Sequence, residues 1–142
     1  MRLLVRTTVV LAIAAAGCAA LPIAEPTLYA RMGGADVVKR VVDDTIDRSA
    51  SDARTARSFS GVKLERVKEK LREQICELSG GPCKYTGDPM KAVHKGLKNT
   101  EAEFYLLVQF LRDALARNGV GEREKNELLR LLAPMKRDIV TS

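Results

Sequence analysis

Apolar residues after position 27 recur at spacings of three and four, and no stretch shows the alternation of a half-buried strand. This pattern is typical of helices that each bury one face, so the domain is predicted to be all-α. A short first turn should stop at Gly33 and Gly34. The long helices predicted by the pattern cover about residues 36–49, 62–79, 100–118 and 122–140.

Particular residues mark helix ends. Thr100 and Glu103 form a capping box, in which each side chain satisfies a backbone N–H at the start of a helix. Pro134 should kink the last helix, because proline removes one backbone hydrogen bond. Asp88 followed by Pro89 predicts the start of a short additional helix that ends before residue 97.

The N-terminal segment resembles a secretory signal peptide. Arg2 and Arg6 precede an apolar run too short to span a bilayer stably, and small residues follow directly before Cys18. A cysteine in that place also resembles a bacterial lipobox, which predicts an exported lipoprotein anchored to the membrane by a lipid on Cys18. Ordinary signal cleavage is the alternative. The predicted segments are a signal peptide at 1–17, a tether at 18–27 and a folded domain at 28–142.

The net charge gives no sign of nucleic-acid binding. The chain has 24 basic and 18 acidic side chains, a formal net charge of +6. Removing residues 1–17 takes away two arginines and no acid, which leaves +4. Because the charges are mixed along the helices rather than clustered with aromatic residues, they imply at most a weak attraction to anionic lipid.

Cys76 and Cys83 flank a Gly-Gly-Pro turn and are predicted to form a disulfide in an oxidising compartment. Such a bond would pin the loop that leads to His94, the only histidine of the chain. The alternative is a zinc site, but two cysteines and one histidine fall short of the four ligands that a structural zinc needs.

His94 is the first candidate for a metal ligand. The predicted short helix places it on the same face as Met90 and next to Val93. A lone histidine is nevertheless more often an ordinary surface or core residue than a ligand. Spacing alone therefore leaves both interpretations open.

Several separated motifs, in this order, resemble the group I truncated haemoglobins. They are LYARMGG at 28–34, VVDDTIDR at 41–48, RSFSG at 57–61, GGPCKYTGDPMKAVHKGL at 80–97 and LAPMKRDIV at 132–140. The resemblance implies a two-over-two helical sandwich, a truncated globin domain, that encloses one haem b. It also implies that His94 is the proximal iron ligand and that Phe59 is the phenylalanine that wedges the haem.

Apolar side chains are available where the resemblance places a haem pocket. Such a pocket excludes water and protects ferrous haem. Ordinary core is the alternative for each of these residues, because core packing and haem packing use the same residue types. The residues assigned to the pocket in this way are Met90, Val93, Leu97, Phe104 and Leu107.

The distal side departs from the family pattern. Ile46 stands where a tyrosine is usual, Leu71 where a glutamine is frequent, and Val67 at another distal position. None of these side chains donates a hydrogen bond. A donor would contribute about 1 to 3 kcal/mol to oxygen binding, so its absence predicts an affinity lower by roughly ten- to a hundredfold.

Lys70 is a candidate for a distal iron ligand, because some family members place a histidine or lysine at this position. Ligation needs the neutral amine, which desolvation beside haem would favour. A second interpretation is that Lys70 donates a hydrogen bond to the bound gas or contacts a haem propionate. The third is simple solvation, since Lys63, Arg66, Lys68 and Arg72 make this stretch densely charged.

These features predict a membrane-tethered haem protein that reversibly binds oxygen or nitric oxide. An enzyme on the same scaffold, acting on nitric oxide or peroxide, is less favoured because proton delivery needs a positioned distal group. Ligation by Lys70 would instead suggest a six-coordinate redox protein with a partner still to be identified. An apo structural lipoprotein is a further alternative, since Lys98 and Asn99 also depart from the family pattern.

Overall fold

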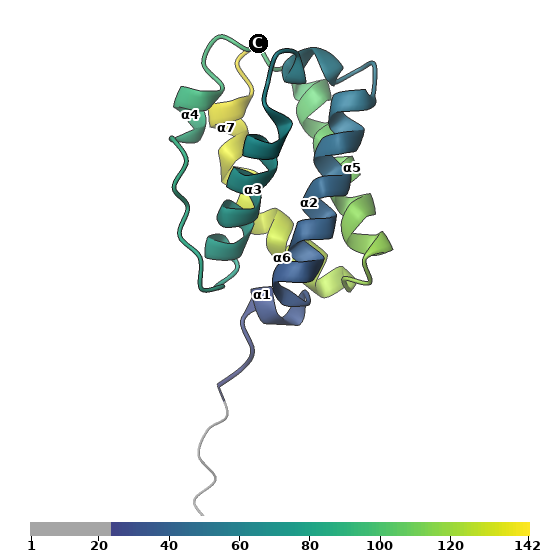
Figure 1. The fold of residues 1–142 in the computed structure, drawn as a ribbon, viewed down its shortest axis with the longest axis vertical. Coiled ribbons are helices and arrows are strands. Elements are labelled where there is room, and N and C mark those ends of the chain that lie inside the picture. Colours follow the sequence, from purple (N-terminus) through teal and green to yellow (C-terminus); the bar gives the residue numbers. More distant parts are fainter. Residues whose placement is uncertain (1–23) are drawn as a thin grey trace, which may run out of the picture.

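The computed structural model describes residues 24–142, which form helices and loops without any strand (Figure 1). The predicted all-α class is confirmed. The predicted signal peptide, Cys18 and most of the tether lie outside the described residues. The elements are α1 Leu28–Arg31, α2 Gly34–Ser51, the 3₁₀ turn η1 Ala56–Phe59, α3 Leu64–Leu78, α4 Met90–Val93, α5 Glu101–Arg117, α6 Glu122–Leu132, the 3₁₀ turn η2 Ala133–Met135 and α7 Lys136–Ile139.

Helix α2 runs through the centre of the bundle and packs against α3 and α5, while α1 packs on α6 and α4 on α7 (Figure 1). The apolar side chains of α2 that face the interior are almost completely removed from water. Full burial of one such aliphatic side chain stabilises by about 1.5 to 3 kcal/mol, so this stripe anchors the fold. The buried apolar residues of α2 are Val38, Val41, Val42 and Ile46. Within 24–142, no helix combines the length and the apolar character needed to cross a membrane.

Three helix boundaries show how far local signals determine the fold. The capping box of Thr100 and Glu103 is present at the start of α5, as predicted. Pro134 does more than kink the last helix: it lies in η2, which separates α6 from α7. Gly33, with a φ of 104°, is the N-cap of α2 in the left-handed conformation, and the helix begins at Gly34. The glycines that were predicted to end the first turn therefore connect α1 directly to α2.

The connection between α2 and α3 contains the 3₁₀ turn η1. Thr55 is buried, and its hydroxyl donates to the backbone carbonyl of Ser49 at 2.6 Å. The backbone N–H groups of Thr55 and Ala56 both donate to the carbonyl of Asp52. These bonds tighten the chain into η1, which places Phe59 against the core.

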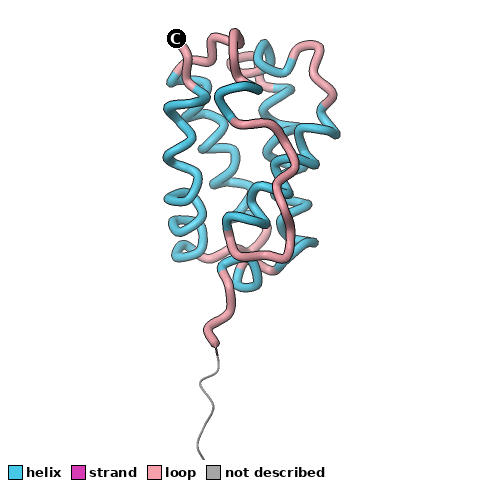
Figure 2. Tube along the Cα trace, turned by 90° about the vertical axis from the view of Figure 1, so that its left-hand side faces the viewer, coloured by secondary structure: helices cyan, strands magenta, loops and turns pink. Residues whose placement is uncertain are grey.

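The long loop between α3 and α4 runs back along α3 on one side of the molecule (Figure 2). The predicted disulfide between Cys76 and Cys83 is present at the start of this loop, with Cα atoms 5.7 Å apart. Further along, Glu77 pairs with Lys84 at 3.0 Å and accepts the backbone N–H of Tyr85 at 3.1 Å. A covalent bond and successive polar contacts therefore align the segment that leads to α4.

We expect replacement of both Cys76 and Cys83 by serine to lower the free energy of unfolding by about 2 to 3 kcal/mol, as the chain-entropy model gives for a short closed loop. Urea unfolding of the oxidised protein and of the double variant measures this difference. A matched control is reduction of the native protein, which should produce the same loss. Equal midpoints before and after reduction would contradict a stabilising role.

Candidate functional site

One cavity of about 490 Å³ lies between α3, α4 and α5, with Ile46 of α2 and Phe59 of η1 also in its wall. Its size is within the range of about 300 to 1,000 Å³ that is usual for cofactor and ligand sites. The structure brings every sequence-predicted pocket residue to this single cavity. They are Ile46, Phe59, Val67, Leu71, Met90, Val93, Leu97, Phe104 and Leu107, together with the candidate ligands His94 and Lys70.

His94 directly follows α4 as its C-cap and lines the cavity. The helix is shorter than predicted: Pro89, not Asp88, is the N-cap, and no side chain caps it. The backbone of Pro89 is extended, so the helix starts only at Met90. The sequence pattern identified the helix but placed its start too early.

The imidazole of His94 is oriented by its own helix. Its Nδ1 lies 2.8 Å from the backbone carbonyl of Met90. A carbonyl only accepts hydrogen bonds, so Nδ1 carries the proton and donates it. In the neutral ring the lone pair is then on Nε2, which is the arrangement that a metal-ligating histidine needs. Elsewhere in the described part of the chain, no group of three or more histidine, cysteine or acidic side chains offers a metal site.

The wall contributed by α2 and α3 is apolar. Ile46 is 2% exposed, and Val67 and Leu71 pack against the core while bordering the cavity. These three side chains exclude water from the wall and provide no hydrogen-bond donor. The structure thus contains the apolar surface that the sequence indicated.

Gln74 was missed by the sequence analysis. It lies on α3 one turn after Leu71 and two turns after Val67, and it lines the same cavity. The spacing of three and seven residues could have identified it, because such positions share one helix face. The sequence analysis predicted mainly apolar residues for that face, and Gln74 adds a polar one.

Lys70 is held by carboxylates at the edge of the cavity. Its Nζ lies 2.8 Å from Glu73, 3.0 Å from Glu69 and 2.7 Å from the hydroxyl of Thr86. The hydrogen bonds to Glu73 and Glu69 raise the pKa of Lys70 above its ordinary value. The hydrogen bond from Lys70 in turn helps lower the pKa of Glu73 to about 2. The amine is therefore protonated, whereas iron ligation requires its neutral form.

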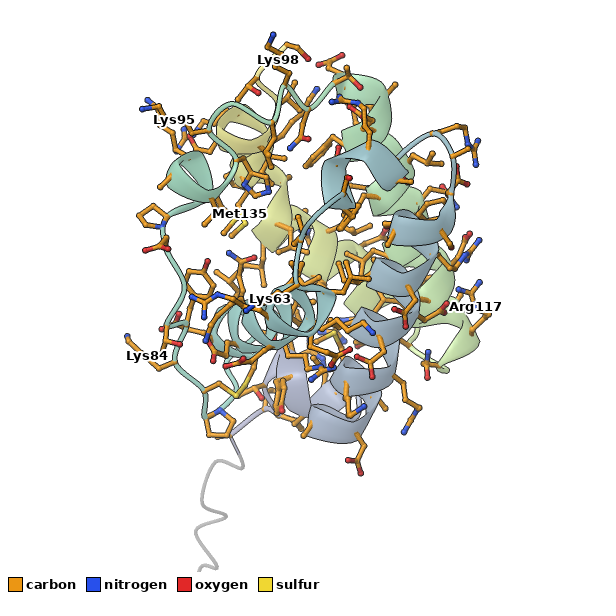
Figure 3. The ribbon with its side chains drawn as sticks, turned by 45° about the horizontal axis from the view of Figure 1, so that its top comes forward. Lys63, Lys84, Lys95, Lys98, Arg117 and Met135 are labelled. Carbon is orange, nitrogen blue, oxygen red and sulfur yellow. A yellow bond between two sulfur atoms is a disulfide. The ribbon has the colours of Figure 1, made fainter. Side chains whose placement is uncertain are left out.

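Two basic residues at the start of α3 face the cavity without a counter-charge. Lys63, labelled in Figure 3, and Arg66 both line it, and neither forms an ion pair with another residue of 24–142. By contrast, Lys84, Lys95 and Lys98 point away from the body of the molecule in Figure 3. The edge of the cavity therefore offers two cations for an anionic group.

A polar network stabilises the part of the cavity wall that contains Glu103. Arg57 of η1 pairs with Glu103 of α5 and donates to the carbonyls of Leu97 at 3.2 Å and Lys98 at 2.8 Å. It thereby connects the turn after His94 to the wall that carries Phe59. Burial alone would raise the pKa of Glu103, but hydrogen bonds from Thr100 and Arg57 outweigh it and lower that pKa.

Replacing Glu103 with alanine is expected to destabilise the protein by about 1 to 2 kcal/mol at neutral pH, since it removes half of the capping box. The lowered pKa means that the Glu103 carboxylate stabilises the fold above its usual pKa of 4.5, and this contribution disappears as the pH falls through the folded value. The difference between wild type and variant should therefore shrink in acid. Urea midpoints from pH 7 downward measure it, and a constant difference would contradict the assignment.

Sequence comparison relates the chain to haem proteins. Residues 27–141 match the family model described as bacterial-like globin. The chain is 37% identical over 119 residues to the group 1 truncated hemoglobin GlbN of Mycolicibacterium paratuberculosis, covering 83% of this chain and 88% of that protein. It is 30% identical over 110 residues to the group 1 truncated hemoglobin GlbN of a Nostoc species, covering 78% of this chain and 93% of that protein.

Solved structures share the fold. The Fe(III) form of truncated hemoglobin from Tetrahymena pyriformis matches with a TM-score of 0.77 and 23% identity, over 82% of this chain and all of that one (100%). Hemoglobin from Chloroflexus aurantiacus matches with a TM-score of 0.72 and 25% identity, over 83% of this chain and 100% of that chain. The two-over-two arrangement expected from the sequence is therefore confirmed.

Proposed function

The chain belongs to the bacterial-like globins, among the group 1 truncated haemoglobins, and we propose that it holds haem through His94 and reversibly binds a diatomic gas. Membership of the family implies haem binding. The observation that carries the assignment to His94 is its hydrogen bond to Met90, which leaves Nε2 as the lone-pair nitrogen beside the cavity. Iron in bound haem supplies the site at which oxygen or nitric oxide binds.

The residues around the cavity fit a haem b group. Apolar side chains from α3 and α5 cover the faces where a porphyrin ring would exclude water. Lys63 and Arg66 are placed to pair with the two propionates, since neither has a carboxylate partner among the described residues. Phe59 is held in the wall by η1 and packs against the core. Apolar side chains are thus available for the porphyrin ring, and two cations are available for its propionates.

We favour five-coordinate over six-coordinate haem. A lysine ligand requires a neutral amine, and Lys70 is protonated between Glu69 and Glu73. Withdrawing it from both carboxylates and from Thr86 would cost three polar contacts. A gas ligand would then enter an open position next to Ile46 and Leu71, without competition from a side chain.

The visible spectrum of the full-length chain with haem supplied tests this function. We expect a Soret band at a stoichiometry of one haem per chain, a reduced spectrum of the five-coordinate type, and a shift of that band on addition of carbon monoxide. The Lys70→Ala variant is the matched control and should give the same reduced spectrum. Absence of a Soret band would reject haem binding and favour the apo structural alternative.

We also propose that the domain is exported and anchored by a lipid on Cys18. The support is the signal-like sequence of residues 1–17, and the disulfide of the described domain suits an oxidising compartment. Expressed in a bacterium, the native chain should incorporate labelled palmitate into the membrane fraction, and Cys18→Ser should not. Equal labelling of both chains, or none of either, would reject the anchor.

A further inference from the structure

The segment that carries His94 has little packing of its own. Helix α4 is a single turn, and no side chain caps its start. A helix of that length is not stable in isolation. From Lys91 to Lys98, His94 is the only residue that is not exposed, and the helix packs on α7. Contacts from outside the helix must therefore fix the position of the imidazole.

Polar contacts hold the chain directly after this helix. The backbone carbonyls of Leu97, Lys98 and Asn99 are three consecutive acceptors, and each accepts a hydrogen bond from outside the segment. Arg57 donates to Leu97 at 3.2 Å and to Lys98 at 2.8 Å. The carbonyl of Asn99 accepts the backbone N–H of Thr141 at 3.0 Å. The turn after α4 is thus held between η1 and the chain that follows α7.

The backbone of Lys98 indicates that these contacts impose the conformation of the turn. Its φ is 51°, the only positive φ of a residue other than glycine in 24–142. The left-handed region is unfavourable for a residue with a Cβ, so tertiary contacts must maintain it. The carbonyl of this residue accepts from Arg57 and also from the hydroxyl of Ser142 at 3.1 Å. The contacts therefore determine the backbone path of the turn.

Arg57 has the chemistry to hold several acceptors at once. Its planar guanidinium presents five donors in a fixed fork. It lies in η1, two residues before Phe59, and pairs with Glu103 of α5. The side chain of Arg54, in the same connection between α2 and α3, pairs with Asp52 instead. Of the two arginines, Arg57 contacts the turn after α4, and Arg54 supplies a matched control.

We propose that Arg57 is a positioning residue for His94, an inference that rests on the proposed function. By holding the carbonyls of Leu97 and Lys98, it fixes the turn that ends α4, and with it the place of the imidazole relative to the wall that carries Phe59. Groups that orient a metal ligand typically change metal affinity by about ten- to a hundredfold. The side chain of Arg57 is 52% exposed, so water competes for its hydrogen bonds and the effect should lie near the lower value.

Haem release and the iron–histidine stretching frequency of the reduced, haem-loaded, full-length chain test the proposal. We expect Arg57→Met to transfer haem to an excess of apomyoglobin about tenfold faster than the wild type does. Its iron–histidine band should shift or broaden, because the imidazole is no longer held in one place. Methionine is unbranched and has no donor, so it removes the hydrogen bonds of the arginine. Arg54→Met, the matched control, should leave both measurements unchanged.

Arg57→Lys separates positioning from a merely structural role. Lysine keeps a positive charge beside Glu103, but its ammonium cannot reproduce the planar fork. Without haem, this variant should melt near the wild-type temperature, whereas with haem it should still show faster haem release and an altered band. If lysine restored wild-type haem release and the wild-type band, the charge alone would account for the effect, and the positioning role would be rejected. If Arg57→Met does not fold, Arg57→Lys serves for the same measurements.

The wild-type spectrum distinguishes failure of this inference from failure of the proposed function. A wild type that binds no haem, or binds it without an iron–histidine band, would reject His94 as the ligand and the proposed function with it. A normal wild-type band with equal haem release in wild type and Arg57→Met would reject only the positioning role. Faster release with an unchanged band would also reject that role, because it indicates wider access to the cavity and not a displaced imidazole.

Discussion

Replacing His94 with glycine is expected to abolish stable haem binding while the helical fold persists. Among the described residues that line the cavity, His94 has the only imidazole, and its hydrogen bond to Met90 orients the ring. Its side chain has a single hydrogen bond, to Met90, so its loss removes little of the packing. We expect the dissociation constant for haem to rise by at least about a hundredfold, as for the loss of a principal metal ligand.

Haem titration followed at the Soret band measures this effect, and circular dichroism verifies the fold. Lys95→Gly is the matched control, because it adds the same backbone freedom to the same turn without removing the imidazole. Free imidazole should restore a Soret band in His94→Gly by occupying the vacated space. Wild-type haem affinity in that variant, without added imidazole, would show that another group holds the iron.

Local rules explain why much of the site could be predicted from the sequence. The 3.6-residue period of α3 places Val67 and Leu71 on one face, and the capping box of Thr100 and Glu103 sets the start of α5. These signals act within one or two turns and need no tertiary information. The family motifs then singled out His94 as the proposed iron ligand, a role that spacing alone left open.

Contacts between distant segments explain what could not be predicted. The partners of Lys70 include Thr86, which reaches α3 only because the loop folds back after the disulfide. Arg57 meets Glu103 across a separation of 46 residues.

The second large effect is expected on the distal side, where replacing Ile46 with tyrosine should slow oxygen dissociation about ten- to a hundredfold. The hydroxyl would add a donor worth about 1 to 3 kcal/mol in surroundings with little competing water. Ile46 borders the cavity, which leaves room for the larger ring on that side. Because Ile46 is only 2% exposed, the larger ring would also overpack the side that faces the core, which typically lowers stability by about 1 to 3 kcal/mol.

Comparison with Ile46→Phe isolates the hydroxyl, because the two rings fill nearly the same space and only tyrosine donates. Stopped-flow oxygen release should therefore be slow in the tyrosine variant and close to wild type in the phenylalanine variant. Equal rates in the tyrosine and phenylalanine variants would mean that a donor at position 46 does not reach the ligand.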